Sequence, residues 1–80
     1  MDLAIIFGRA LRDLRKKARL TQEQLGFEAE LERNFISMLE RGERQPTLTT
    51  LVKLARPLQC SASYLVALVE SAAAADSTTE

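Results

Sequence analysis

Apolar residues recur every three or four positions along the first twenty residues of the chain. The stripe consists of Leu3, Phe7, Ala10, Leu11, Leu14 and Ala18. From residue 9 onward, basic side chains occupy most of the positions between them. This periodicity is typical of an amphipathic helix that buries one face. The sequence therefore predicts a first helix with a basic outer surface.

A second helix is predicted over about residues 22–29. Thr21 precedes it with a hydroxyl that can cap the first turn, and Gln24 stands three residues later, as in a capping box. Leu31 then marks a break before the next periodic segment. The second helix is consequently short.

A third helix is predicted over about residues 32–41. Ile36 and Leu39 have the spacing of inward-facing side chains, and Gly42 is suited to end the helix in a left-handed conformation. Residues 43–46 are polar and finish on a proline, which favours a loop.

Two further helices follow this loop. Thr47 is expected to cap the fourth, whose apolar positions are Leu48, Leu51, Leu54, Ala55 and Leu58. Pro57 should end or kink it, because proline removes a backbone hydrogen bond. Ser61 is expected to cap the fifth helix, over about residues 62–70.

The fold class follows from these elements. No segment alternates apolar and polar residues as a strand does, so we expect an all-α domain of five compact helices over residues 1–70. Residues 71–80 contain no large apolar side chain and are expected to form a flexible C-terminal tail.

Composition narrows the possible functions. Eighty residues, 46% apolar and 28% charged, are typical of one globular domain, and no apolar run is long enough to span a membrane. The start lacks the basic region of a signal peptide, so we expect a cytoplasmic protein. The chain has no histidine and a single cysteine, Cys60, which we expect to pack in the core. This excludes zinc sites of nitrogen and sulfur ligands and the common nucleophile pairs, so neither a cofactor nor an enzyme is expected.

Charge is balanced in total but unevenly distributed. Eleven basic and eleven acidic side chains give a net charge of zero. Six basic residues lie between Arg9 and Arg19 against one acid, whereas Glu23, Glu28 and Glu30 follow with no base among them. This balance argues against a general polyanion-binding tail. It leaves room for a nucleic-acid binder whose positive groups converge on one face.

The second and third predicted helices form a helix-turn-helix pattern. Gly26 lies inside the second helix, where the missing side chain lets the third helix cross closely. That benefit must exceed the roughly 0.5–1 kcal/mol that a mid-helix glycine costs relative to alanine. Leu31, Ile36 and Leu39 are expected to fill the wedge between the two helices.

From about residue 7 to residue 69, the chain resembles the phage-repressor and Cro-type (XRE) family of DNA-binding domains. The motifs that carry the resemblance are LTQEQL at 20–25, FISMLERG at 35–42 and PTLTTL at 46–51. Within that family, ERNFIS at 32–37 is most similar to the small dimeric controller proteins of restriction–modification systems.

The resemblance implies that the third helix enters the major groove with its N-terminal residues towards the base edges. The candidate base-reading residues are Glu32, Arg33, Asn34, Ser37 and Met38. Arg33 can donate two parallel hydrogen bonds to guanine, Asn34 can pair bidentately with adenine, and Glu32 can accept from cytosine. Met38 can contact a thymine methyl group. Each residue has a simpler alternative as a surface side chain, and Glu32 as a helix cap.

Four further residues match family positions that meet the DNA backbone: Gln22, Phe35, Arg41 and Arg44. Gln22 is also placed near the free amides and positive dipole that begin the second helix. Arg41 could instead complement the dipole at the end of the third helix.

The resemblance also implies a structural ion pair between Arg15 and Glu40, which would tie the first helix to the third. Two departures from the family pattern lie in turns. Glu30 and Gln59 stand where glycine is usual. A left-handed conformation at Glu30 would cost about 1 kcal/mol, unless the turn differs slightly.

A homodimer is expected through the fifth helix, because its apolar residues cannot all face one small core. These residues are Tyr64, Leu65, Leu68 and Val69. Two recognition helices would then read palindromic half-sites about 34–36 Å apart. The alternative is that all four pack inside the monomer. The chain is too short for a ligand-binding domain beside this one, so no small-molecule effector is expected.

The sequence predicts a transcriptional regulator that binds double-stranded DNA, with a restriction–modification controller as the first interpretation. An antitoxin or phage-type repressor with the same domain is the first alternative. A protein-interaction module that has lost DNA binding is the second. Bound near a promoter, the protein could block RNA polymerase or activate by touching it, and the sequence leaves both open.

Overall fold

The computed structural model describes residues 2–77. Within this range the chain forms five α-helices and no strand, which confirms the predicted all-α class. The helices are α1 (Leu3–Lys17), α2 (Gln22–Ala29), α3 (Arg33–Glu40), α4 (Leu48–Ala55) and α5 (Ala62–Ser77). None of the helices in this range combines the length and apolar character that a membrane span requires.

Short polar side chains begin four of the helices, and at α1 the Asp2 carboxylate accepts from the Ala4 amide at 3.1 Å. Thr21 and Gln24 form a reciprocal capping box at α2, with Thr21 Oγ1 accepting from the Gln24 amide at 3.0 Å. The Thr47 hydroxyl accepts from the Thr50 amide at 3.1 Å, and Ser61 Oγ accepts from the Tyr64 amide at 3.0 Å. These bonds satisfy backbone donors that have no partner within a helix, so local sequence sets where these helices start.

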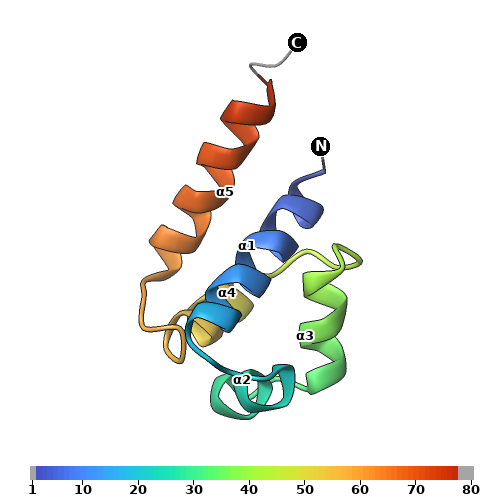
Figure 1. Cartoon of the computed structure of the whole chain (residues 1–80), viewed down its shortest axis with the longest axis vertical. Coiled ribbons are helices and arrows are strands. Elements are labelled where there is room, and N and C mark those ends of the chain that lie inside the picture. Colours follow the sequence, from blue (N-terminus) through green and yellow to red (C-terminus); the bar gives the residue numbers. More distant parts are fainter. Residues whose placement is uncertain (1, 78–80) are drawn as a thin grey trace.

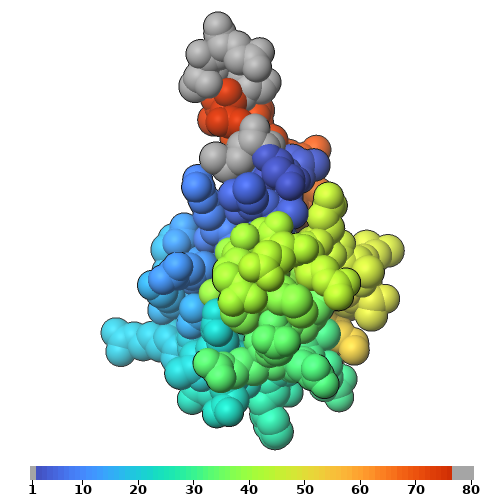
Figure 2. Space-filling view, turned by 90° about the vertical axis from the view of Figure 1, so that its right-hand side faces the viewer, coloured from blue at the N-terminus to red at the C-terminus, as the bar shows by residue number. Residues whose placement is uncertain are grey.

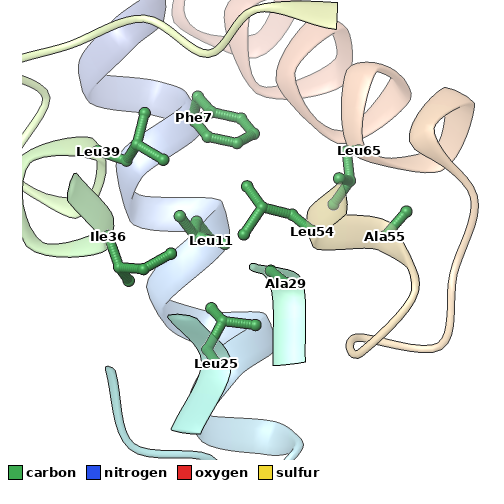
Figure 3. Packing of buried hydrophobic residues seen from close by; sticks show 9 residues of the cluster. All are labelled: Phe7, Leu11, Leu25, Ala29, Ile36, Leu39, Leu54, Ala55 and Leu65. Carbon is green, nitrogen blue, oxygen red and sulfur yellow. The ribbon is translucent and has the colours of Figure 1, made fainter. Parts of the chain in front are cut away.

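The central helix is α1, which contacts both α5 and α3 (Figure 1). It runs antiparallel to α5, while α2 and α3 pack together near its C-terminal end. Side chains from every helix meet in one core (Figure 3). The core residues are Phe7, Leu11, Leu25, Ala29, Ile36, Leu39, Leu54, Ala55 and Leu65. The helix-turn-helix is therefore supported from behind by α1.

Gly8 brings α1 unusually close to the end of α3. A Cβ atom built on Gly8 would lie 2.5 Å from the Leu39 carbonyl oxygen and 2.6 Å from that of Glu40. Both atoms are backbone, so no side-chain rotation could relieve the contact. The periodicity of the first helix gives no sign of this requirement, because the glycine falls among larger apolar residues.

Three residues of the apolar stripes predicted for the first and fourth helices are exposed. Leu3 is 51% exposed, Leu48 is 76% exposed, and Ala18 is exposed in the turn after α1. Each lies at or next to a helix end, where the neighbouring helices no longer cover the stripe. Ala4 and Ile6 are buried instead in the first turns of α1. Helical spacing thus identified the face of each helix but not how far the core extends along it.

The fifth helix is longer than predicted. It was expected to end near residue 70 and give way to a flexible tail, but α5 continues to Ser77. Residues 72–75 are alanines, which have the highest helix propensity and stabilise a helix without burying a large side chain. Residues 78–80 of the expected tail lie outside the described residues.

Candidate nucleic-acid interface

The turn between α2 and α3 depends on two backbone features. A Cβ atom on Gly26 would approach the Leu31 carbonyl oxygen to 2.6 Å, so the close crossing of α3 requires a glycine there. Glu30 adopts a left-handed conformation, with φ 59° and ψ 43°, at the end of α2. The left-handed turn is therefore kept without the usual glycine.

The third helix has one buried side and one exposed side. Ile36 and Leu39 are fully buried, which fixes the rotation of α3 about its axis. Figure 2 looks onto the face that carries α3 (green), beside residues at the start of α2 (cyan). This exposed side is the surface that a groove of DNA would meet.

The candidate base-reading residues all lie in α3 or at its cap. Glu32, Arg33 and Asn34 are exposed, and Ser37 and Met38 are half-buried. Glu32 is the N-cap residue, but its carboxylate makes no capping hydrogen bond. Within residues 2–77, these five side chains form no hydrogen bond or ion pair with the protein. Their donors and acceptors remain available to a ligand.

A shallow hollow lies between the start of α2 and the N-terminal half of α3. It has a volume of about 330 Å³ and is lined by Gln22, Arg33, Asn34 and Ser37. The side chains of Gln22, Arg33 and Asn34 supply N–H donors, and Ser37 supplies a hydroxyl. The structure thus brings a predicted backbone-contacting residue together with three predicted base-reading residues.

The Glu40 carboxylate connects this surface to α1. Arg15 donates from Nε to Glu40 Oε2 at 2.6 Å and from Nη2 to Oε1 at 3.0 Å, forming a two-bond ion pair. Gln22 Nε2 donates to the same Oε1 at 3.1 Å. The Glu40 hydrogen bond raises the pKa of the Arg15 guanidinium. The side chains of Arg15 and Glu40 are only 11% and 4% exposed, so this ion pair is structural.

The hydrogen bond from Gln22 was not foreseen from the sequence. It holds the Gln22 amide at the rim of the hollow and leaves its second N–H free for another acceptor. The spacing of Gln22 and Glu40 along the chain gives no signal for this contact, because it depends on how α2 packs against the end of α3.

The other predicted backbone-contacting residues differ in their surroundings. Phe35 is half-buried against the core. Arg41, the C-cap of α3, is exposed and pairs with Glu43 at 2.9 Å in the following loop. Arg44 is exposed, and no described residue pairs with it. Arg44 is therefore the freer of the two arginines that follow α3.

The predicted dimer residues do not share one surface. Leu65 is 1% exposed and belongs to the core of the monomer, so its assignment to a dimer surface is wrong. Tyr64 is 48% exposed and lines a groove between α1 and α5 together with Leu68. Val69 packs on the core from the other flank of α5. Buried Leu65 therefore separates Tyr64 and Leu68, on one flank of α5, from Val69 on the other.

Comparison with known proteins places this geometry in a family. The family described as HTH_3, Helix-turn-helix, matches residues 11–65. The control protein C.BamHI of Bacillus amyloliquefaciens is 36% identical over 58 residues, which cover 71% of this chain and 72% of that protein.

Two solved structures are similar in both fold and sequence. The restriction–modification controller protein C.AhdI from Aeromonas hydrophila has a TM-score of 0.75 at 37% identity, covering 78% of this chain and 94% of that chain. The P22 c2 repressor in complex with a synthetic operator has a TM-score of 0.70 at 37% identity, covering 75% of this chain and 91% of that chain. With the matching helix-turn-helix geometry, these similarities show that the chain belongs to the phage-repressor and Cro-type (XRE) helix-turn-helix family.

Proposed function

We propose that this protein is a sequence-specific DNA-binding transcriptional regulator. The observation that carries the proposal is the set of unpaired polar side chains at the N-terminal half of α3, adjoining the hollow at Gln22. Arg33 and Asn34 read base edges in the major groove, while Gln22 and the amides that begin α2 bind a phosphate. Glu32, Ser37 and Met38 complete the base-reading set.

Backbone contacts flank this set. Phe35, Arg41 and Arg44 lie along or just after α3, where they approach the sugar–phosphate chain. The Arg41 ion pair with Glu43 is more than half exposed, so it costs little to exchange for a phosphate. The proposed activity is binding alone and uses no catalytic group. It is exerted in the cytoplasm, where bacterial and phage operators are found.

The regulator acts as a homodimer on a palindromic operator. One eight-residue recognition helix reads only a few base pairs, and a two-fold partner doubles the site. The similarity to C.BamHI and C.AhdI over most of their lengths supports a controller of a restriction–modification system as the biological role.

The test is selection of bound sequences from a random DNA pool at near-physiological salt. The wild-type protein is compared with Arg33→Ala and with Arg56→Ala, which removes the same charge from the exposed end of α4. We expect a palindromic consensus with half-sites about 34–36 Å apart. Arg33→Ala should lose about 10- to 100-fold in affinity and relax one position in each half-site, because a bidentate pair contributes roughly 1–3 kcal/mol.

Two results would contradict the proposal. Failure of the folded wild-type protein to enrich any sequence would indicate a protein-interaction module instead. Equal losses for Arg33→Ala and Arg56→Ala would mean that binding follows net charge and not base recognition.

A further inference from the structure

A groove of about 530 Å³ runs between α1 and α5. Its floor is largely apolar and includes Ile6 and Leu14 of α1 and Tyr64 and Leu68 of α5. At one end, Leu14 and Lys17 also line a second hollow of about 390 Å³, which extends to the turn between α4 and α5. The two hollows therefore form one continuous surface along α1.

Three charged side chains of α1 form a row along the groove. Arg9, Asp13 and Lys17 all line it, and their spacing of four residues places them on one side of the helix with alternating sign. All three are exposed, and within residues 2–77 none of them forms an ion pair. Asp76, the other charged residue of the groove, already has an interaction within the chain. The row thus presents a base, an acid and a base beside an apolar floor.

The signs of the charges in this row argue against a second copy of the chain as the occupant. A two-fold axis through the middle of the row would set Asp13 against its own copy and Arg9 against the partner's Lys17. Every facing pair would then have like charge, which weakens association. The groove therefore suits a different protein, and the proposed homodimer needs another surface.

The shape of the groove suits a helix. It follows α1 from Ile6 to Lys17, a length of about 16 Å or three helical turns. Residues four apart on a helix advance by about 6 Å, so a partner helix repeats the spacing of the row. An extended segment would leave its backbone groups unpaired here, because residues 2–77 contain no strand with an edge to pair with.

We propose that the groove between α1 and α5 docks an amphipathic helix of a different protein. The apolar stripe of that helix packs on the floor of the groove. Beside the stripe, an acid, a base and an acid at four-residue spacing pair with Arg9, Asp13 and Lys17. An apolar centre with a charged rim is the usual composition of a protein interface. This inference goes beyond the proposed function and does not depend on it.

The groove lies away from the candidate DNA-binding surface. The helix α1 is placed between α3 and α5, and it contacts both (Figure 1). Arg15 faces α3 through its ion pair with Glu40, whereas Asp13, two residues earlier, lies about 200° away around the helix axis. A partner helix in the groove therefore leaves α3 free to contact DNA.

The probes are two labelled helical peptides of identical composition, about four turns long, without tyrosine or tryptophan. Both carry a leucine stripe, which is flanked by an acid–base–acid row in one peptide and by a base–acid–base row in the other. Binding to the full chain is followed by anisotropy and by the fluorescence of Tyr64, the one tyrosine of a chain without tryptophan. The acid–base–acid peptide should bind about 10-fold or more tightly than its rival at low salt, because each exposed ion pair changes affinity by about 1.5- to 5-fold.

A variant with the row reversed tests the recognition of charge. The combination of Arg9→Glu, Asp13→Lys and Lys17→Glu should prefer the base–acid–base peptide by a similar factor. Arg12→Glu is the matched control, because it lowers the net charge by as much as the triple variant, at an exposed position of α1 outside the groove. It should keep the wild-type preference. Circular dichroism should show that both variants are folded.

The outcomes separate this inference from the proposed function. Failure of both peptides to bind the wild-type protein overturns it, as does equal binding of the two. A triple variant that keeps the wild-type preference also overturns it. Selection of bound DNA should give the same result with and without the acid–base–acid peptide, and loss of DNA binding would place the peptide on α3 and overturn the inference. If the wild-type protein enriches no DNA sequence, the proposed function fails while the peptides still decide the role of the groove.

Discussion

Substitution of Gly8 by alanine has two opposing effects on the stability of the protein, and the size of each can be worked out. Alanine is favoured over glycine inside a helix by about 1 kcal/mol, so propensity alone predicts that Gly8→Ala stabilises α1. The added methyl group, however, would lie 2.5 and 2.6 Å from the carbonyl oxygens of Leu39 and Glu40. Ordinary contacts of this kind begin at 3.4 Å. The end of α3 must therefore move away from α1 by nearly 1 Å.

That movement disturbs buried contacts. Leu39 is fully buried, and the Arg15–Glu40 ion pair, with its 2.6 Å bond, spans the same two helices. Overpacking of this kind costs about 1–3 kcal/mol, and the upper half applies because the obstructing atoms are backbone. After the gain in propensity, the free energy of unfolding should fall by about 1–2 kcal/mol. In a domain of this size, that lowers Tm by about 5–15 °C.

Urea unfolding followed by circular dichroism, at one protein concentration, measures this change. Ala67→Gly is the control, because Ala67 is exposed within α5 and the substitution reports propensity without a packing change. It should lose about 1 kcal/mol. A Gly8→Ala protein as stable as the wild type, or more stable, would refute the inferred close approach of α1 and α3.

Three other substitutions test separate parts of the structure. Arg15→Met leaves the buried Glu40 carboxylate without its cation and should lower the free energy of unfolding in urea by about 3–5 kcal/mol. Arg41→Ala breaks an exposed ion pair and should change that free energy by less than about 1 kcal/mol. Similar losses for the two variants would contradict the structural role of the Arg15–Glu40 pair. Glu30→Gly should raise the free energy of unfolding by about 0.5–1 kcal/mol, because glycine adopts the left-handed conformation at this position without strain. Glu28→Gly, inside helix α2, should lower it by about 1 kcal/mol. A change of the same sign in both variants would be inconsistent with this reasoning. Arg44→Ala should weaken binding to all DNA sequences alike and reduce the slope of log affinity against log salt by about 1, and a change in the consensus would instead indicate base contact.

Local signals in the sequence predicted where the helices start. Thr21, Thr47 and Ser61 cap their helices as expected, because a short side chain and the first turn of a helix lie within a few residues of each other. Gly42, with φ 74°, follows α3 in the expected left-handed conformation. The spacing of Ile36 and Leu39 likewise identified the buried side of α3.

Local sequence signals did not predict the features that depend on packing between segments far apart in the chain. The contact between Gly8 and the end of α3, and the hydrogen bond from Gln22 to Glu40, join residues at least 18 positions apart. The burial of Leu65 depends on where α5 rests against the core. Periodicity indicates which face of a helix is apolar, but it does not say whether a neighbour or a second subunit covers that face.

The Glu40 carboxylate has a consequence for how the recognition surface can evolve. Gln22, the proposed phosphate contact, shares this acceptor with Arg15, so a substitution at Gln22 would alter the proposed DNA anchoring and the packing of the domain together. Arg33 and Asn34 have no such partner in the described chain, so they can be exchanged at little cost to folding. If these residues have the proposed roles, operator preference is free to diverge between descendants, while selection for stability conserves the way the domain sits on DNA.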